Sequence, residues 1–360
     1  MKKYNLAVRY FPISHGFIHA IIDTSTIMVI LSANVVHDLS PSQSSVMITG
    51  YNLLAFAGQA LLGYGMDKLR IYKNVILLGI ILTAVSVMLM LSHPFAAMVV
   101  AGLGNALFHV GGGAISLNTS PGRATDPGIF VAPGALGLGL GLWLGKNGNT
   151  VLWPFLLALA LSFAISIKSS VPAIESSSKT KPPPIKEPIR LLFLLLFSIS
   201  IRAFMGFAGT YECPKLPAIS MGLTMAAFGG KLLGGIISDR LGWIKTSVGA
   251  LLISAPLIAF GGSNGMIIIV GMFLFQMTMP VTLTAVYTLM PSKPAFSFGL
   301  CCLALILGSL AAGYKIWAVY YSSFTFLGLI TLSAALIFVA LNRLKETTPM
   351  KFTRASGSYI

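Results

Sequence analysis

Apolar residues form long runs from one end of the chain to the other, and short polar segments separate them. A helix that crosses the hydrocarbon core of a bilayer needs about 20 mostly apolar residues. Twelve runs approach this length, so the pattern predicts twelve transmembrane helices. The predicted spans are residues 14–34, 45–66, 74–92, 95–117, 129–145, 150–168, 189–210, 217–237, 246–262, 265–289, 296–314 and 317–341.

One segment near the middle of the chain differs from the others. Residues 169–188 read SSVPAIESSSKTKPPPIKEP, and a segment so rich in Ser, Pro and Lys cannot build a hydrophobic core. We expect a flexible linker here. It divides an all-α membrane protein into an N-terminal six-helix bundle over residues 1–168 and a C-terminal six-helix bundle over residues 189–345, which a tail over residues 346–360 follows.

Composition agrees with a membrane location. The chain is 56% hydrophobic and only 9% charged, whereas a soluble domain is about 25% charged. The first apolar run does not resemble a cleavable signal peptide, because His15, His19 and Asp23 interrupt it and no small-residue cleavage site follows. We therefore expect a multi-pass protein of the inner (plasma) membrane, with the lipid bilayer as its solvent.

The distribution of charge predicts the orientation. The formal net charge is +15, but the basic residues lie in the short gaps between apolar runs, which is the positive-inside pattern and not a nucleic-acid interface. We expect both termini and the linker in the cytoplasm. Outside the linker, the predicted cytoplasmic residues are Lys2, Lys3, Arg9, Lys68, Arg70, Lys73, Arg123, Arg190, Arg240, Lys245, Lys293, Arg343, Lys345, Lys351 and Arg354, and the predicted outer ones are Lys146, Lys215 and Lys315.

A short signature occurs twice, at equivalent places in the two halves. Residues 61–73 read LLGYGMDKLRIYK and residues 232–245 read LLGGIISDRLGWIK. In each copy a glycine permits close helix approach, and an aspartate four residues later can cap a helix N-terminus or pair with a basic residue. We predict that the two copies form a conformational latch, made by Gly63, Asp67, Lys68, Gly235, Asp239 and Arg240.

Twelve spans, a central linker and this doubled signature resemble the major facilitator superfamily over essentially the whole chain. The fuller family loop is Gly-x-x-x-Asp-Arg-x-Gly-Arg-Arg. The second copy keeps Asp239, Arg240 and Gly242, whereas the first has Lys68 for Arg and Arg70 where the later glycine is expected. The resemblance implies a secondary transporter that acts as a monomer on a small molecule, and we expect no cofactor.

A narrower resemblance lies in the fourth predicted span. Residues 102–117 read GLGNALFHVGGGAISL, which is similar to a stretch in the fosmidomycin-resistance group of drug exporters. Val110 stands where that group usually has Pro. This resemblance, with the glycine-rich fifth span, implies export.

Asp23 is the only carboxylate deep inside an apolar run. A charge at this depth costs at least about 2.5–3.5 kcal/mol and should face a cavity or a partner. His15, His19 and Asp23 follow one another at a spacing of four, near one helix face. A carboxylate beside imidazoles can exchange protons near neutral pH. We predict that Asp23 and His19 couple transport to protons and that His15 contacts the substrate. The alternative is that these polar residues only pack one helix against another.

Further polar residues on the predicted spans extend this site. Asn105 and His109 are four residues apart; His109 would share the proton, or bond to a backbone carbonyl, and Asn105 would contact substrate. In the second half, Arg202 and Lys231 either pair with Asp23 across the cavity or bind an anionic substrate. Lys231 could instead extend toward the headgroups. The remaining candidate substrate contacts are Gln59, Gln276 and Tyr287.

These features predict a secondary active transporter that works by alternating access, with proton-coupled efflux of a drug or metabolite as the first interpretation. A proton-coupled uptake symporter for an organic or phosphorus-containing anion is the alternative. A metal-ion carrier would have to use His15, His19 and Asp23, a small ligand set, and we predict no metal site. An intramembrane enzyme would need a nucleophile with its base or a metal motif, which the sequence lacks.

Overall fold

The computed structural model describes residues 10–171, 185–210, 216–313 and 322–347, and every regular element within these ranges is helical. The first half contains α2 (Phe11–Val36), α3 (Pro41–Asn52), a π-helical turn (Leu53–Ala57), α4 (Gly58–Leu69), α5 (Tyr72–Leu89), α6 (Pro94–Thr119), α7 (Thr125–Lys146) and α8 (Trp153–Lys168). The second contains α9 (Pro188–Ala208), α10 (Pro217–Leu241), α11 (Trp243–Phe260), α12 (Gly265–Gln276), α13 (Met279–Leu289), α14 (Pro294–Gly313) and α15 (Ser323–Thr347).

Eleven helical segments in these ranges are long and apolar enough to cross a bilayer, so the all-α membrane fold is confirmed. The sixth predicted span, residues 150–168, is the exception. Helix α8 there has 16 residues, fewer than the roughly 20 that a perpendicular span requires. Its start is delayed because Gly148, with φ of +62°, ends a turn after α7 and Pro154 lies in the first turn of α8.

Local sequence explains where several helices begin and where two spans are interrupted. Helices α3, α6, α9, α10 and α14 each begin at a proline, whose missing N–H would have no partner in a first turn anyway. Proline also explains the break between α12 and α13. Pro280 cannot donate to the carbonyl of Gln276, so the span divides there. The break gives Thr278 and Thr282 a defined place beside α9.

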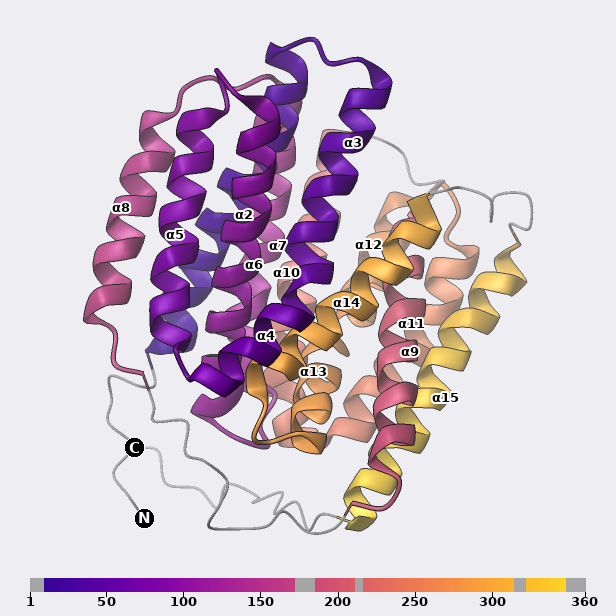
Figure 1. Ribbon diagram of the computed structural model, residues 1–360. Helices are drawn as coiled ribbons and strands as arrows, with labels where there is room; N and C mark the ends of the chain where they lie inside the picture. The colour runs from indigo at the N-terminus through magenta and orange to yellow at the C-terminus, as the bar shows by residue number, and fades with distance from the viewer. Residues whose placement is uncertain (1–9, 172–184, 211–215, 314–321, 348–360) are drawn as a thin grey trace, which may run out of the picture.

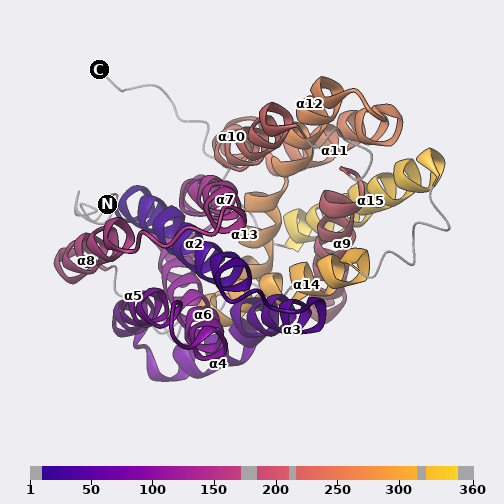
Figure 2. The same cartoon turned by 90° about the horizontal axis from the view of Figure 1, so that it is seen from above.

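The helices form two groups, which Figure 1 shows on either side of α4 and α14. Figure 2 shows α2 to α8 on one side and α9 to α15 on the other. The groups meet where α4 packs on α14 and where α7 packs on α10. These pairs are equivalent. Helix α4 ends the second span of the first half, Pro41–Leu69, and α10 is the second span of the other half, whereas α7 and α14 are each the fifth predicted span of their half. The interface therefore follows the internal repeat.

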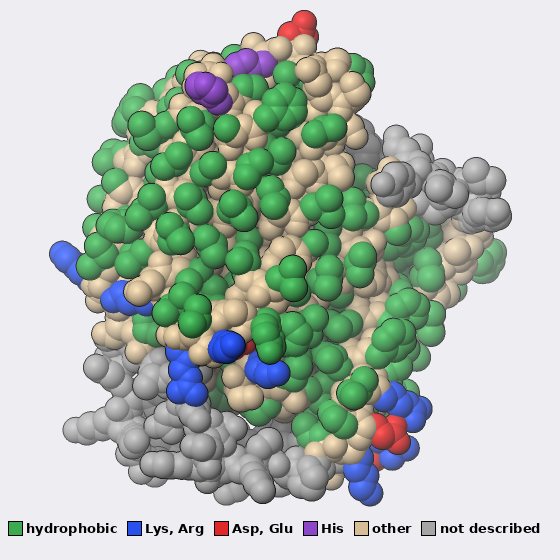
Figure 3. Space-filling model, viewed as in Figure 1, with side chains coloured by type: hydrophobic (Ala, Val, Ile, Leu, Met, Phe, Trp, Pro, Cys, Tyr) green, Lys and Arg blue, Asp and Glu red, His purple; other side chains and the backbone are tan. Residues whose placement is uncertain are grey.

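The surface matches the division between lipid and water. Hydrophobic side chains cover the middle of the face in Figure 3, and the Lys and Arg side chains lie toward the lower end, which carries the α4–α5 turn. Large apolar side chains face outward, including Leu61 and Ile189 at 82% exposure. Of the charge pattern, Lys2, Lys3, Arg9, Lys215, Lys315, most of the linker and most of the tail lie outside the described residues.

Candidate functional site: a buried histidine pair beside a cationic cavity

The first copy of the repeated signature joins the two groups of helices. The carboxylate of Asp67, at the end of α4, accepts hydrogen bonds from the backbone N–H groups of Ala295 (3.0 Å) and Phe296 (2.8 Å) in the first turn of α14. It also accepts one from the hydroxyl of Tyr72 at 2.9 Å. A carboxylate at this position satisfies amides that have no partner within the helix and faces the positive end of the helix dipole.

The second copy makes the equivalent contact in the opposite direction. Asp239, at the end of α10, accepts from the backbone N–H groups of Ala124 and Thr125 at the start of α7, each at 2.9 Å. The hydroxyl of Thr125 donates at 2.5 Å, and Arg123 Nε lies 3.6 Å from the carboxylate. Each aspartate therefore caps a helix of the other group.

The signature glycines make these contacts sterically accessible. A Cβ on Gly63 would lie 2.6 Å from the carbonyl carbon of Ala295, and a Cβ on Gly235 would lie 2.5 Å from the carbonyl oxygen of Ala124. Lys68 and Arg240 have no hydrogen-bond or ion-pair partner among the described residues. The capping aspartates and glycines, and not these basic residues, make the contact.

Inside the first half, two predicted proton-coupling histidines face one another. Nε2 of His19 on α2 lies 2.7 Å from Nε2 of His109 on α6, with the ring planes at 85°. The carboxylate of Asp23 lies against both, with Oδ2 at 3.1 Å from His19 and Oδ1 at 3.4 Å from His109. Both histidines are buried, and the side chain of Asp23 is 17% exposed. We call these three residues the histidine–aspartate cluster.

Backbone carbonyls determine the tautomers of the pair. Nδ1 of His19 lies 2.9 Å from the carbonyl oxygen of Phe130, and Nδ1 of His109 lies 2.8 Å from that of Asn105. A carbonyl only accepts, so both Nδ1 atoms carry hydrogen. Each neutral ring then has a lone pair at Nε2, and two lone pairs at 2.7 Å repel unless a proton lies between them. The geometry is that of one proton shared by two imidazoles beside a carboxylate.

The same atoms constitute a candidate metal group, because one ligand atom from each residue lies within 4.8 Å of the others. Tetrahedral zinc with bonds of about 2.0–2.1 Å would hold two nitrogens about 3.3 Å apart and takes four ligands. The 2.7 Å separation of the Nε2 atoms fits a proton better.

Three neighbours hold the cluster in place. Asn105 Nδ2 donates to Asp23 Oδ1 at 3.0 Å, so this residue orients the carboxylate and is not in the cavity lining. Thr26 accepts from Tyr51 at 2.9 Å beside it. Gly134 on α7 provides the space, since a Cβ there would lie 2.8 Å from Asp23 Oδ2 and collide with the His19 ring. The sequence shows a glycine-rich fifth span, but it does not show that Gly134 faces the cluster, because this depends on how α7 packs on α2.

His15 lies apart from the cluster. Its ring stacks on Phe11 at 3.8 Å between centroids, and its Nε2 lies 3.3 Å from Ser166 Oγ of α8. The structure therefore does not bring it to the cavity. Gln59 is also elsewhere, fully buried with Nε2 donating to the carbonyl of Ala55 at 2.5 Å. Tyr287 bonds to Asn118 Oδ1 at 3.1 Å, which joins α13 to α6.

A cavity of about 330 Å³ is lined mostly by helices of the second half, with Leu138 of α7 from the first, and contains the other predicted substrate contacts, Arg202, Lys231 and Gln276. Arg202 is 7% exposed; its NH1 donates to Thr278 Oγ1 and its NH2 to Thr282 Oγ1 at 2.8 Å. The two threonines were not predicted from the sequence, although their spacing of four around Pro280 is a visible signal. Much of the remaining wall is aromatic and aliphatic.

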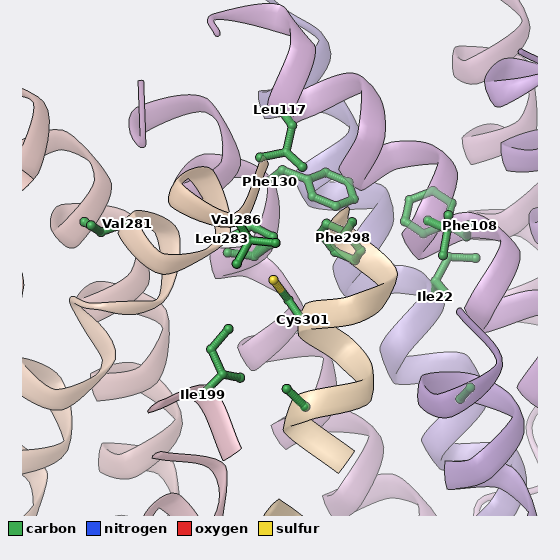
Figure 4. Close-up of a cluster of buried hydrophobic side chains, with 14 of the residues drawn as sticks. Ile22, Phe108, Leu117, Phe130, Ile199, Val281, Leu283, Val286, Phe298 and Cys301 are labelled. Atoms are coloured by element: carbon green, nitrogen blue, oxygen red, sulfur yellow. The ribbon is translucent and has the colours of Figure 1, made fainter. Parts of the chain in front are cut away.

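Aromatic rings separate the cavity from the histidine–aspartate cluster. Phe298 lines the cavity and contacts Phe130, with ring centroids 6.3 Å apart, and Phe130 contacts His19 at 5.0 Å. Figure 4 shows Phe130 and Phe298 together, with Leu283 and Cys301 nearby. Lys231 lines the cavity on the far side of these rings, and no ion pair within 4 Å joins it to Asp23.

Comparison with known proteins agrees with this architecture. The family model described as Major Facilitator Superfamily matches residues 15–301. No curated protein matches the chain. The solved E. coli fucose:proton symporter, FucP, covers 95% of this chain and 99% of its own at 14% identity, with a TM-score of 0.71. A second FucP structure, described as a major facilitator transporter in the outward conformation, covers 92% and 99% at 15% identity, with a TM-score of 0.65.

At these identities the solved structures establish the fold, and the narrower resemblance to fosmidomycin-resistance exporters stays a prediction. The family match covers most of the chain. It includes the residues of α2 and α6 that form the cluster and Gly134 of α7, which leaves room for it. The protein is a multi-pass membrane transporter and not an enzyme. It belongs to the Major Facilitator Superfamily.

Proposed function

We propose that the protein is a proton-coupled secondary transporter in which the histidine–aspartate cluster carries the proton. It works as a monomer in the inner membrane with both termini cytoplasmic, and α8 completes a set of twelve spans in two six-helix bundles. The single observation that carries the proposal is the 2.7 Å contact between two Nε2 atoms whose rings both donate through Nδ1.

The charge of the cluster changes by one unit when that proton leaves. With the proton, the imidazole pair is cationic, Asp23 is anionic, and the cluster as a whole is neutral. Without it, the Nε2 lone pairs repel and the carboxylate has lost its closest cation. An uncompensated buried charge is costly, so the deprotonated cluster favours a rearrangement of α2, α6 and α7. Proton binding is thereby linked to helix packing.

The two signature aspartates stabilise one of the two conformations between which this rearrangement takes place. Asp67 and Asp239 close one end of the molecule by capping α14 and α7. Opening that end requires both caps to break, since each joins helices of different groups. We propose that the repeated signature is a latch of the closed end, and that alternating access rocks the two groups about the cavity.

The direction of transport depends on how the substrate and the proton affect one another. Efflux against the proton gradient, the first interpretation, requires the two to exclude each other. The alternative of proton symport requires them to bind together. FucP is described as a fucose:proton symporter, but at 14% and 15% identity its structures support only the fold of this chain.

The proposal is tested in proteoliposomes with a compound that stabilises the purified protein in a thermal-shift screen. A pH gradient should drive accumulation by the wild type. Asp23→Asn should abolish accumulation but retain exchange across the membrane, since exchange requires no net proton movement. His15→Gln is the matched control, because it alters an equally buried histidine of the same helix outside the cluster. Gradient-driven accumulation by Asp23→Asn at the wild-type level would contradict the proposal.

A further inference from the structure

Two cations in the cavity lack an anionic partner. No carboxylate among the described residues lies within 4 Å of Arg202 or Lys231, and both line the cavity. Arg202 is buried, with only 7% of its surface exposed. Buried charges in proteins are normally paired, because the loss of hydration is not otherwise compensated. The cavity therefore carries a positive charge that no described side chain neutralises.

The donors of Arg202 are oriented and only partly used. The hydroxyls of Thr278 and Thr282 accept from its terminal nitrogens and donate their own hydrogens to backbone carbonyls, at 3.0 Å to Phe275 and 3.1 Å to Met279. They position the guanidinium without neutralising it. Its Nε has no partner among the described residues. A planar guanidinium whose charge is not neutralised suits the two oxygens of a carboxylate.

The rest of the cavity is suited to an apolar body. Phe207, Phe275 and Phe298 line it, with Ile199 and Leu305. A volume of about 330 Å³ lies at the lower end of small-molecule sites. We propose that the substrate is a small organic monoanion, with its carboxylate on Arg202 and Lys231 and its apolar body against the phenylalanines. This inference rests on the proposed function, because it names the substrate of the same transporter.

The position of Lys231 links the anion to the proton. Lys231 and Phe298 line the same cavity, and Phe298 contacts Phe130, which contacts His19 of the cluster. Across this apolar layer of low dielectric, the charge of Lys231 acts on Asp23. The other titratable groups around the cluster are His19 and His109, Tyr51 on α3, and the thiols of Cys301 and Cys302 on α14, which carry no charge at neutral pH. An anion beside Lys231 removes part of the attraction that Asp23 feels, so a proton on the cluster becomes more favourable. Linkage is reciprocal, and the proton in turn strengthens anion binding.

Positive linkage determines the transport mode. An anion and a proton that favour each other occupy the protein together and cross the membrane together, as a neutral pair. We therefore infer anion–proton symport for this protein. A cationic substrate at the same place would be linked to the proton with the opposite sign, which is the condition for antiport.

The experiment uses the full-length protein in lipid nanodiscs and a matched set of probes. The set comprises straight-chain and aromatic carboxylates, including 3-phenylpropionate, the neutral amide 3-phenylpropionamide and the cation 3-phenylpropylamine. Binding is measured by calorimetry, and proton exchange by a pH indicator in weakly buffered solution. At least one carboxylate should bind and take up about one proton per anion, by reciprocal linkage, and the amide and amine should not bind.

Variants separate the two parts of the account. Arg202→Gln should weaken carboxylate binding at least about tenfold, as expected for the loss of a charge-assisted contact. Lys231→Met is the second variant and should reduce proton uptake more than binding. His109→Gln should bind the carboxylate without proton uptake. Carboxylate binding with proton release would overturn symport, and amine binding that Arg202→Gln leaves unchanged would overturn the anion assignment.

Two further outcomes distinguish this inference from the proposed function. If no carboxylate binds, but gradient-driven accumulation of another compound still requires Asp23, the anion inference is wrong and the proton site stands. If a carboxylate binds through Arg202 with no proton exchange in the wild type, the symport inference and the proposed function both fail, and the anion site remains.

Discussion

Nε2 of His19 and Nε2 of His109 lie 2.7 Å apart although the two residues are 90 positions apart in the chain. Each ring is held from behind by a backbone carbonyl, at 2.9 Å and 2.8 Å. In our proposal, α2 and α6 share a proton at this contact, next to Asp23. Because the cluster is buried, we expect its protonation state to affect how these helices pack.

The space that Gly134 leaves is predicted to be essential for the cluster. Gly134→Ala places a methyl group 2.8 Å from Asp23 Oδ2 and against the His19 ring. We expect a loss of stability of about 1–3 kcal/mol, as for other overpacked positions, and loss of gradient-driven transport. Gly249→Ala is the control, because a Cβ at Gly249 meets nothing within 4 Å. Equal transport by the two variants would show that the cluster tolerates displacement.

The latch is predicted to hold one end closed through its aspartates. Asp67→Asn or Asp239→Asn removes the charge at a helix N-terminus, which is worth about 1–2 kcal/mol and shifts a two-state population about 5- to 30-fold. Spin labels at Leu69 and Leu241, both 65% exposed, placed in a variant that lacks the native cysteines, should report a longer distance. Asp38→Asn, at an exposed turn outside the latch, should leave the distance unchanged. An unchanged distance in both latch variants would contradict the role.

Arg70 provides a test of the unequal signature copies. It occupies the position of Gly242 in the other copy and has φ of +58°, a left-handed conformation that glycine adopts freely. Arg70→Gly should raise the free energy of unfolding by about 0.5–1 kcal/mol, seen as a higher melting temperature. Arg70→Ala loses the same charge without the conformational relief and should not raise it. A rise in both variants would indicate that charge and not conformation is responsible.

The sequence predicted most of the architecture, because the hydropathy of a span is set by the bilayer and not by its neighbours. The length of α8 was missed because the polar turn around Gly148 takes residues from the expected span. Helix capping was one of the two roles predicted for the latch aspartates, beside pairing with a basic residue, but which helices are capped depends on the packing of α4 on α14 and α10 on α7. Contacts between the halves have no signal in local periodicity.

The candidate site was predicted in part for a similar reason. His19 and Asp23 are one helical turn apart and lie together. His15 is two turns from Asp23, and eight residues at 3.6 per turn rotate it by about 80°, toward α8. His109 was found because a polar residue in a span is rare. Its contact with His19, and the threonines that hold Arg202, depend on tertiary packing that a single sequence does not contain.

The central claim, a proton shared by His19 and His109, is tested most directly by ¹⁵N NMR of histidine-labelled protein in nanodiscs, with His15→Gln to assist assignment. At slightly acidic pH both rings should carry hydrogen at Nδ1, and one proton should be shared between the Nε2 atoms. As the pH rises, both Nε2 signals should change together when that proton leaves, because two rings that share one proton respond as one unit. Independent titration of the two rings, or a ring with hydrogen on Nε2 and none on Nδ1, would contradict the account.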